Sequence, residues 1–188
     1  MREERQNEET GGFFSVFTDA WKSRGIPFVF EKRDGFAVIT GYRDSLLPKA
    51  EIPSVLRGIP VKKIGSRAFL QCDFIEEVFI SDGVETVEAN AFSSCDRLTK
   101  IHMADSVTSI GRNVFFECEN LYDVKLSSLL RELGPRAFFG CTGLRDIELP
   151  DSLESIGDQA FWLNKLEKVT FADGCLLDSM GQYAFGGN

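Results

Sequence analysis

The residues of this 188-residue chain that could do chemistry are its cysteines and its single histidine. Four of the five cysteines recur every 23 residues, at Cys72, Cys95, Cys118 and Cys141. Thiolates can bind a metal ion, form disulfides, or serve as nucleophiles beside a histidine. The long spacing is unlike a Cys-x-x-Cys zinc motif, and no histidine recurs at the same position of the repeat. We therefore predict no metal site and no cofactor.

Structural packing explains the recurring cysteines best, because a buried free cysteine behaves as a small hydrophobe. Stacked strands lie roughly 4.8 Å apart, so neighbouring thiols would also be close enough for a disulfide, which stays open as an alternative. Cys175 lies outside the ladder and is the best candidate for a reactive thiol.

The histidine, His102, lies in a predicted strand, on the face opposite Ile101 and Met103. A nucleophilic pair needs hydrogen-bond reach, whereas the ladder cysteines belong to a predicted turn. The chain also has no glycine loop of the phosphate-binding type. We predict no catalytic residues and no enzyme activity, and keep an enzyme site in the irregular fifth copy only as a distant alternative.

These residues belong to a unit that recurs about every 23 residues and organises the chain. Its most regular position is a phenylalanine, found at Phe69, Phe92, Phe115, Phe138, Phe161 and Phe185. A small residue precedes it, three apolar positions follow it, and a glycine usually closes the unit. A fixed period of this size is typical of a solenoid, in which stacked units merge their apolar positions into one core.

Each unit predicts two extended segments and one turn. The Leu-x-x-Val-x-Leu part alternates with period two, which indicates a strand with one buried face, paired in parallel and in register with its neighbours. The Val-x-x-Ile-Gly part is a second extended segment on the opposite side. The Ala-Phe-x-x-Cys part predicts a short helical or 3₁₀ turn. Glu88 replaces the glycine in one copy, so this turn need not have positive φ.

The ends of the chain differ from the repeats. Residues 1–10 predict a disordered acidic lead, residues 11–60 an N-terminal cap, and residues 61–188 the leucine-rich repeats. The cap comprises an amphipathic helix from Phe13 and a hairpin around Arg33-Asp34-Gly35, although the aromatic face of that helix could instead dock a partner. Residues 171–188 open a sixth unit with no polar helix after it, which leaves a chain boundary or an end-to-end homo-oligomer as explanations.

Two columns of residues point outward from the predicted strands. The first column contains Phe79, His102, Lys125, Glu148 and Thr170, and the second contains Glu77, Lys100, Asp123, Asp146 and Lys168. In the second column opposite charges are neighbours at Glu77–Lys100, Lys100–Asp123 and Asp146–Lys168, which fits pairing on a solvated face. Solenoids also bind partners on such faces, and an outward aromatic residue such as Phe79 favours binding. We take Phe79, His102, Lys125, Glu148, Thr170, Glu77, Lys100 and Asp123 as the candidate binding residues.

The repeat pattern resembles the BspA-like leucine-rich repeats, most clearly in the fourth copy, residues 133–153. This resemblance implies a leucine-rich-repeat solenoid, mostly β with short helical turns, of about five 23-residue repeats behind the cap. It also implies a binding scaffold, with adhesion at the surface of bacteria as the role most often attached to the family.

Composition limits the partners and the location. A formal charge of −8 argues against nucleic acid, and no apolar run approaches a membrane span. The first ten residues are not a signal peptide, so Met1 as the natural start predicts an intracellular protein, whereas the resemblance implies a cell-surface or secreted one. The favoured function is non-enzymatic protein binding through the strand face. The alternative is a structural spacer or self-associating module without a dedicated ligand site.

Overall fold

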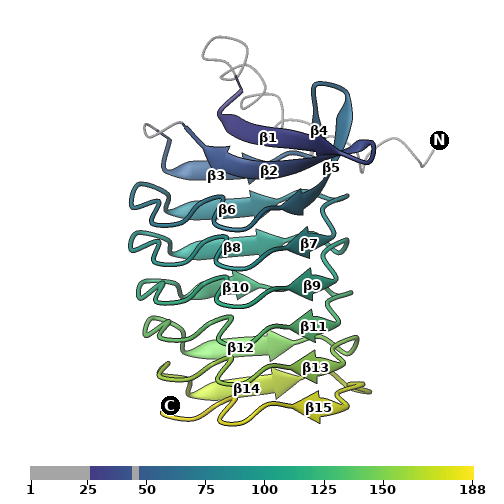
Figure 1. Cartoon of the computed structure of the whole chain (residues 1–188). Helices are drawn as coiled ribbons and strands as arrows, with labels where there is room; N and C mark the ends of the chain where they lie inside the picture. The colour runs from purple at the N-terminus through teal and green to yellow at the C-terminus, as the bar shows by residue number, and fades with distance from the viewer. Residues whose placement is uncertain (1–25, 44–46) are drawn as a thin grey trace, which may run out of the picture.

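The structure is a computed structural model that describes residues 26–43 and 47–188. The chain winds as a β-solenoid of about six turns, in which each unit lies directly on the one before it (Figure 1). The predicted solenoid of repeats is therefore confirmed. The acidic lead and the helix predicted from Phe13 fall outside the described residues.

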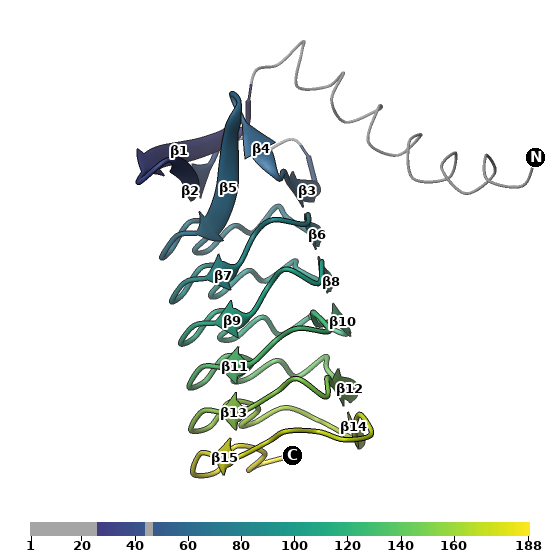
Figure 2. The same cartoon turned by 90° about the vertical axis from the view of Figure 1, so that its right-hand side faces the viewer.

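Two sets of parallel strands form opposite sides of the stack (Figure 2). One side contains β3 (Lys49–Ile52), β6 (Glu77–Ile80), β8 (Lys100–Met103), β10 (Asp123–Lys125), β12 (Asp146–Leu149) and β14 (Lys168–Phe171). The other contains β5 (Ile59–Ile64), β7 (Thr86–Val87), β9 (Ser109–Ile110), β11 (Glu132–Leu133), β13 (Ser155–Ile156) and β15 (Ser179–Met180). Equivalent residues pair in register, as Val78 does with Ile101, because units of equal length place like positions side by side.

The cap joins this stack through strand pairing. The predicted hairpin is present as β1 (Phe28–Arg33) and β2 (Phe36–Tyr42), with Asp34 and Gly35 at positive φ in its turn. Strand β2 pairs in parallel with β5, and β5 pairs antiparallel with β4 (Val55–Leu56). The hairpin therefore continues the sheet of the β5–β15 side beyond the first repeat.

The turn of each unit is not the predicted short helical or 3₁₀ turn, since the described residues contain no helix of either kind. In the third unit Asn113, Phe115 and Glu117 donate their N–H groups to carbonyls of the next unit, over 2.7–3.0 Å. Phe116 and Cys118 instead donate to the carbonyl three residues earlier. Asn113 and Glu117 have φ near +56°, a conformation that interrupts a helix. Alternate N–H groups thus close the turn and bind the neighbouring unit.

The recurring phenylalanines form the centre of the core. Phe69, Phe92, Phe115, Phe138 and Phe161 are fully buried. Consecutive rings from Phe69 to Phe185 stack with centroids 4.7–5.6 Å apart and with interplanar angles of at most 21°. This distance is close to the roughly 4.8 Å spacing of neighbouring strands, so the rings stack without changing the backbone spacing.

The recurring glycines are required by close backbone approach and not by positive φ. A Cβ built on Gly134 would lie 2.5 Å from the carbonyl carbon of Gly111, in the unit before it. Neither residue has a positive φ, as the presence of Glu88 at the equivalent position predicted. Omission of the side chain lets successive units approach closely at this corner.

We expect Phe115→Ala to lower the free energy of unfolding by about 3–5 kcal/mol, because it removes a fully buried ring that contacts two others. Urea denaturation followed by circular dichroism measures this change. Phe116→Ala is the control, since Phe116 is only partly buried although its ring stacks 5.0 Å from Phe139. A loss for Phe115→Ala no larger than that of the control would contradict a core built on the ring column.

Candidate functional site

A pocket of about 350 Å³ opens on the outward side of β3, β6, β8 and β10. We call it the strand-face pocket. It is lined by Glu51, Phe79, Ile80, Ser81, Asp82, His102, Met103, Ala104 and Lys125. Three predicted binding residues, Phe79, His102 and Lys125, meet here because β6, β8 and β10 pair in register.

The Phe79 ring is held between an imidazole and an ammonium group. The His102 ring lies with its centroid 5.3 Å from that of Phe79, at an interplanar angle of 74°. The Lys49 Nζ lies 4.4 Å from the Phe79 ring centroid, within cation–π range. An edge-to-face neighbour and a cation fix the orientation of this half-buried ring while part of it stays accessible.

A chain of charged side chains lies along the pocket and contains the other predicted residues of β6, β8 and β10. Lys49 pairs with Glu77 at 3.5 Å, Glu77 with Lys100 at 4.0 Å, and Lys100 with Asp123 at 3.3 Å. The His102 Nε2 lies 3.0 Å from the Asp123 Oδ1. Such partly exposed pairs each contribute only a few tenths of a kcal/mol, so their main effect is to orient His102.

The ionisation of this chain follows from its contacts. Partial burial alone would raise the pKa of Asp123, but hydrogen bonds from His102 and Lys100 outweigh it and lower that pKa. The hydrogen bond to Asp123 and the charge of Glu77 raise the pKa of Lys100. Burial raises the pKa of Glu51, against the opposing charge of Lys49. Asp123 and Lys100 therefore stay charged at neutral pH.

Two predicted residues, Glu148 and Thr170, do not join this group. They pair with each other across β12 and β14, which form a separate two-stranded sheet. The ladder of strands is interrupted between β10 and β12. The outward columns predicted as continuous are thus divided after Lys125, and the pocket lies wholly in the first part.

Six residues of the pocket had not been predicted as binding residues: Glu51, Ile80, Ser81, Asp82, Met103 and Ala104. Glu51 belongs to β3, which precedes the first recognisable repeat yet pairs in register with β6. The alternation of Lys49-Ala50-Glu51-Ile52 resembles the strand part of the unit and could have revealed it. Ile80 and Met103 end β6 and β8, where the sequence pattern predicts buried side chains. Ser81, Asp82 and Ala104 follow the strands, where the direction of a side chain cannot be predicted from the period of two.

The ladder cysteines pack as buried thiols. The Sγ atoms of Cys95, Cys118 and Cys141 each donate to the phenylalanine carbonyl of the preceding unit, over 3.0–3.1 Å. Burial raises the pKa of Cys72 to about 12, and the pKa of Cys141 is also raised by burial. Asn188 occupies the same repeat position, and its Nδ2 donates to Phe161 O at 2.9 Å. Asparagine can thus make the contact of the cysteine in the last unit, whereas Asn164, at the same position of the fifth unit, is buried without a hydrogen-bond partner.

No group of three or more histidine, cysteine or acidic side chains within residues 26–43 and 47–188 is placed to hold a metal ion. The same part of the chain contains no helix long and apolar enough to cross a membrane.

Parallel strands, short turns and a buried leucine or isoleucine column define this protein as a leucine-rich-repeat solenoid. A family model for the BspA type leucine rich repeat region matches residues 62–188 in six copies, and the chain belongs to this family. The chain matches none of the curated proteins with which it was compared.

Solved structures of bacterial proteins share the fold. A leucine-rich repeat protein from Bacteroides ovatus ATCC 8483 is 29% identical, with a TM-score of 0.67, over 82% of this chain and 45% of that one. A leucine rich cell surface protein from Faecalibacterium prausnitzii A2-165 is 28% identical, with a TM-score of 0.71, over 86% of this chain and 45% of that one. The pneumococcal vaccine antigen PcpA shares the fold at 17% identity and a TM-score of 0.63, over 80% of this chain and 39% of that one. The chain spans less than half the length of these three proteins.

We expect a maleimide reagent at pH 7 to modify Cys175 well before the four ladder cysteines of the native protein. Cys175 is partly exposed, whereas Cys95, Cys118 and Cys141 are buried, and Cys72 stays protonated because its pKa is about 12. Mass spectrometry of peptides at successive times measures the order of labelling. Equal rates for all five thiols would contradict the packing of the ladder, and labelling in urea is the control for reactivity.

Proposed function

We propose that this protein is a non-enzymatic protein-binding scaffold that contacts its partner through the strand-face pocket. One observation supports the proposal most strongly. The oriented, half-buried ring of Phe79 lies in the same cavity as apolar and charged side chains. Binding surfaces take most of their free energy from such anchors at the centre of a polar rim.

The size and lining of the pocket fit part of a protein partner. Ile80, Met103 and Ala104 form an apolar part, while Glu51, Asp82 and Lys125 place charges of both signs around it. A volume of 350 Å³ is near the lower end of ligand pockets and suits one or two side chains of a partner. We expect an apolar or aromatic side chain of the partner to contact Phe79, with its polar neighbours facing the charged rim.

We further propose that this binding serves adhesion at the surface of a bacterium, with the protein on the cell surface or secreted. The similar protein from Faecalibacterium prausnitzii is a leucine rich cell surface protein, which supports this location. Repeat arrays suit adhesion because stacked units hold the pocket on a rigid support.

A pull-down from host and source-cell extracts, read by mass spectrometry, tests the pocket. We expect Phe79→Ala/Lys125→Gln to lose at least about tenfold of the captured partner, because hot-spot residues each contribute about 2 kcal/mol or more. The matched control is Thr170→Ala/Lys168→Gln, which makes the same charge change on β14, outside the pocket. Thermal melting confirms that each variant is folded. A partner captured equally by the wild type and both variants would place binding elsewhere and contradict the proposal.

The second candidate is a self-associating module, and a specific observation favours it. The final unit exposes large apolar side chains, with Phe171 42%, Leu176 64%, Met180 52% and Tyr183 64% accessible. In earlier units the position of Met180 holds a buried isoleucine, leucine or valine, because the next unit covers it. Residues 171–188 could be covered in the same way by a second copy.

Sedimentation velocity over a hundredfold range of concentration tests this candidate. Association through this end predicts a sedimentation coefficient that rises with concentration, and Met180→Lys should suppress the rise because it places a charge in the apolar contact. Leu129→Lys is the control, since Leu129 is similarly exposed but lies in the third unit. A constant monomer value for the wild type would exclude self-association.

A further inference from the structure

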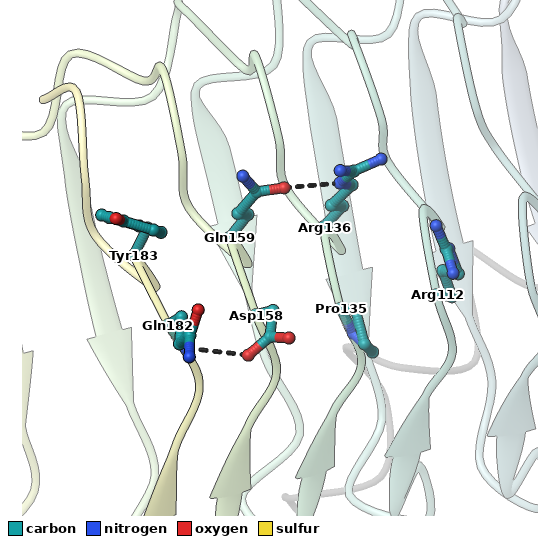
Figure 3. Close-up of a pocket in the computed structure, with 7 residues that line it drawn as sticks. All are labelled: Arg112, Pro135, Arg136, Asp158, Gln159, Gln182 and Tyr183. Atoms are coloured by element: carbon teal, nitrogen blue, oxygen red, sulfur yellow. Dashed lines mark hydrogen bonds between the residues drawn. The ribbon is translucent and has the colours of Figure 1, made fainter.

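A second pocket lies on the outer side of the turns, away from the strand-face pocket. It has a volume of about 320 Å³ and is lined by Arg112, Pro135, Arg136, Asp158, Gln159, Gln182 and Tyr183. Figure 3 shows these side chains along successive turns, with the two arginines toward one end and Tyr183 at the other. We call it the turn-face pocket.

The repeat itself shows which chemistry this surface binds. In the unit of Ser66, the backbone N–H of Ser66 donates to the Glu88 Oε2 at 3.1 Å. In the final unit, the N–H of Gln182 donates to the Asp158 Oδ1 at 2.7 Å (Figure 3). Ser66 and Gln182 occupy the same repeat position, directly after the recurring glycine. At both of these positions, a carboxylate from the neighbouring unit binds the outward N–H.

Arg112 occupies this position in the third unit, but its neighbours offer no carboxylate. The equivalent of Asp158 in the unit before Arg112 is Ala89, and the equivalent of Glu88 in the unit after it is Gly134. Across the described chain, residues 26–43 and 47–188, no acceptor is found for the Arg112 N–H. Arg112 thus has the donor that binds a carboxylate elsewhere, without the carboxylate.

Two guanidinium groups add positive charge beside this N–H. Neither Arg112 nor Arg136 forms an ion pair with another described residue, whereas Arg131 and Arg145 pair with Glu154 and Glu167. The Arg136 Nε donates to the Gln159 Oε1 at 2.7 Å, and its guanidinium carbon lies 5.8 Å from the Phe139 ring centroid. These contacts hold the Arg136 fork in place and leave its terminal nitrogens available.

The acidic side chain that lines this pocket, Asp158, already accepts a hydrogen bond within the protein. Asp158 accepts from the Gln182 N–H at the end of the pocket opposite Arg112 (Figure 3). The arginine end therefore carries two unpaired positive groups and one unpaired N–H, which is the donor set that favours a carboxylate.

We propose that the turn-face pocket binds a carboxylate supplied from outside the chain, held by the Arg112 N–H and by the Arg112 and Arg136 guanidinium groups. The carboxylate takes the place that Glu88 and Asp158 fill in their own units. This site goes beyond the strand-face proposal, since it lies on a different face and uses different residues. Its source is either an acidic peptide segment or a free dicarboxylic acid.

Nuclear magnetic resonance of the ¹⁵N-labelled full chain tests the site directly. The probes are a blocked tetraglutamate peptide and glutarate, added at equal carboxylate concentration and constant ionic strength. We expect a saturable shift of the amide resonance of residue 112. Tighter binding of the peptide identifies an acidic segment as the ligand, and equal binding of the two probes identifies a free acid.

Two variants separate this site from general attraction of anions. Arg112→Gln/Arg136→Gln should bind about tenfold more weakly, because it removes two charge-assisted contacts. Arg131→Gln/Arg145→Gln removes the same charge elsewhere and should bind within about twofold of the wild type. Both pairs lie on the surface, and amide spectra confirm their folding.

Ala89→Asp provides the sharpest comparison. It places a carboxylate in the unit that precedes Arg112, as Asp158 does in the unit that precedes Gln182. The new carboxylate should accept from the Arg112 N–H and reduce binding of both probes about tenfold, while both arginines remain. A non-saturable shift in the wild type, an equal loss in both double variants, or unchanged binding in Ala89→Asp would each overturn the proposal.

Discussion

The close stacking of one unit on the next is the constraint on which the rest of this structure depends. Alternate N–H groups of each turn must meet carbonyls of the following unit, as Phe115 does with Ala137 at 2.8 Å. This spacing stacks the phenylalanine rings at 4.7–5.6 Å and leaves no room for a Cβ on Gly134. The phenylalanine and glycine positions of the repeat look independent in the sequence, but the distance between neighbouring backbones determines both.

The same constraint creates the candidate binding site and sets its limit. In-register pairing places Phe79, His102 and Lys125 side by side on β6, β8 and β10. The strand ladder then stops before β12. Continued pairing would set Asp123 against Asp146, and Pro150 has no N–H where Ala104 and Ala172 donate to the preceding unit. Because the turns stay bonded here, the stack continues while the strand face is divided.

The sequence predicted the features that repeat in every unit, but it did not predict the turn conformation or the limits of the pocket. The phenylalanine period predicted the solenoid, the parallel register and the meeting of Phe79 with His102, since equal unit lengths determine all three. It did not predict the non-helical turn, because positive φ at Asn113 and Glu117 needs no glycine. It missed Glu51, because β3 precedes the first recognisable repeat. It also did not separate Glu148 from the pocket, because a single proline and a like-charge pair break the period locally.

Native-state hydrogen exchange measured residue by residue tests the stacking account most directly. We expect slow exchange at the turn amides of Phe92, Phe115 and Phe138, which donate to the next unit. We expect fast exchange at Arg145, which lies at the break in the strand ladder. The equivalent residue Tyr122 donates to Thr99 O at 3.1 Å and should be protected. Fast exchange at the three phenylalanines, or protection of Arg145 equal to that of Tyr122, would contradict this account.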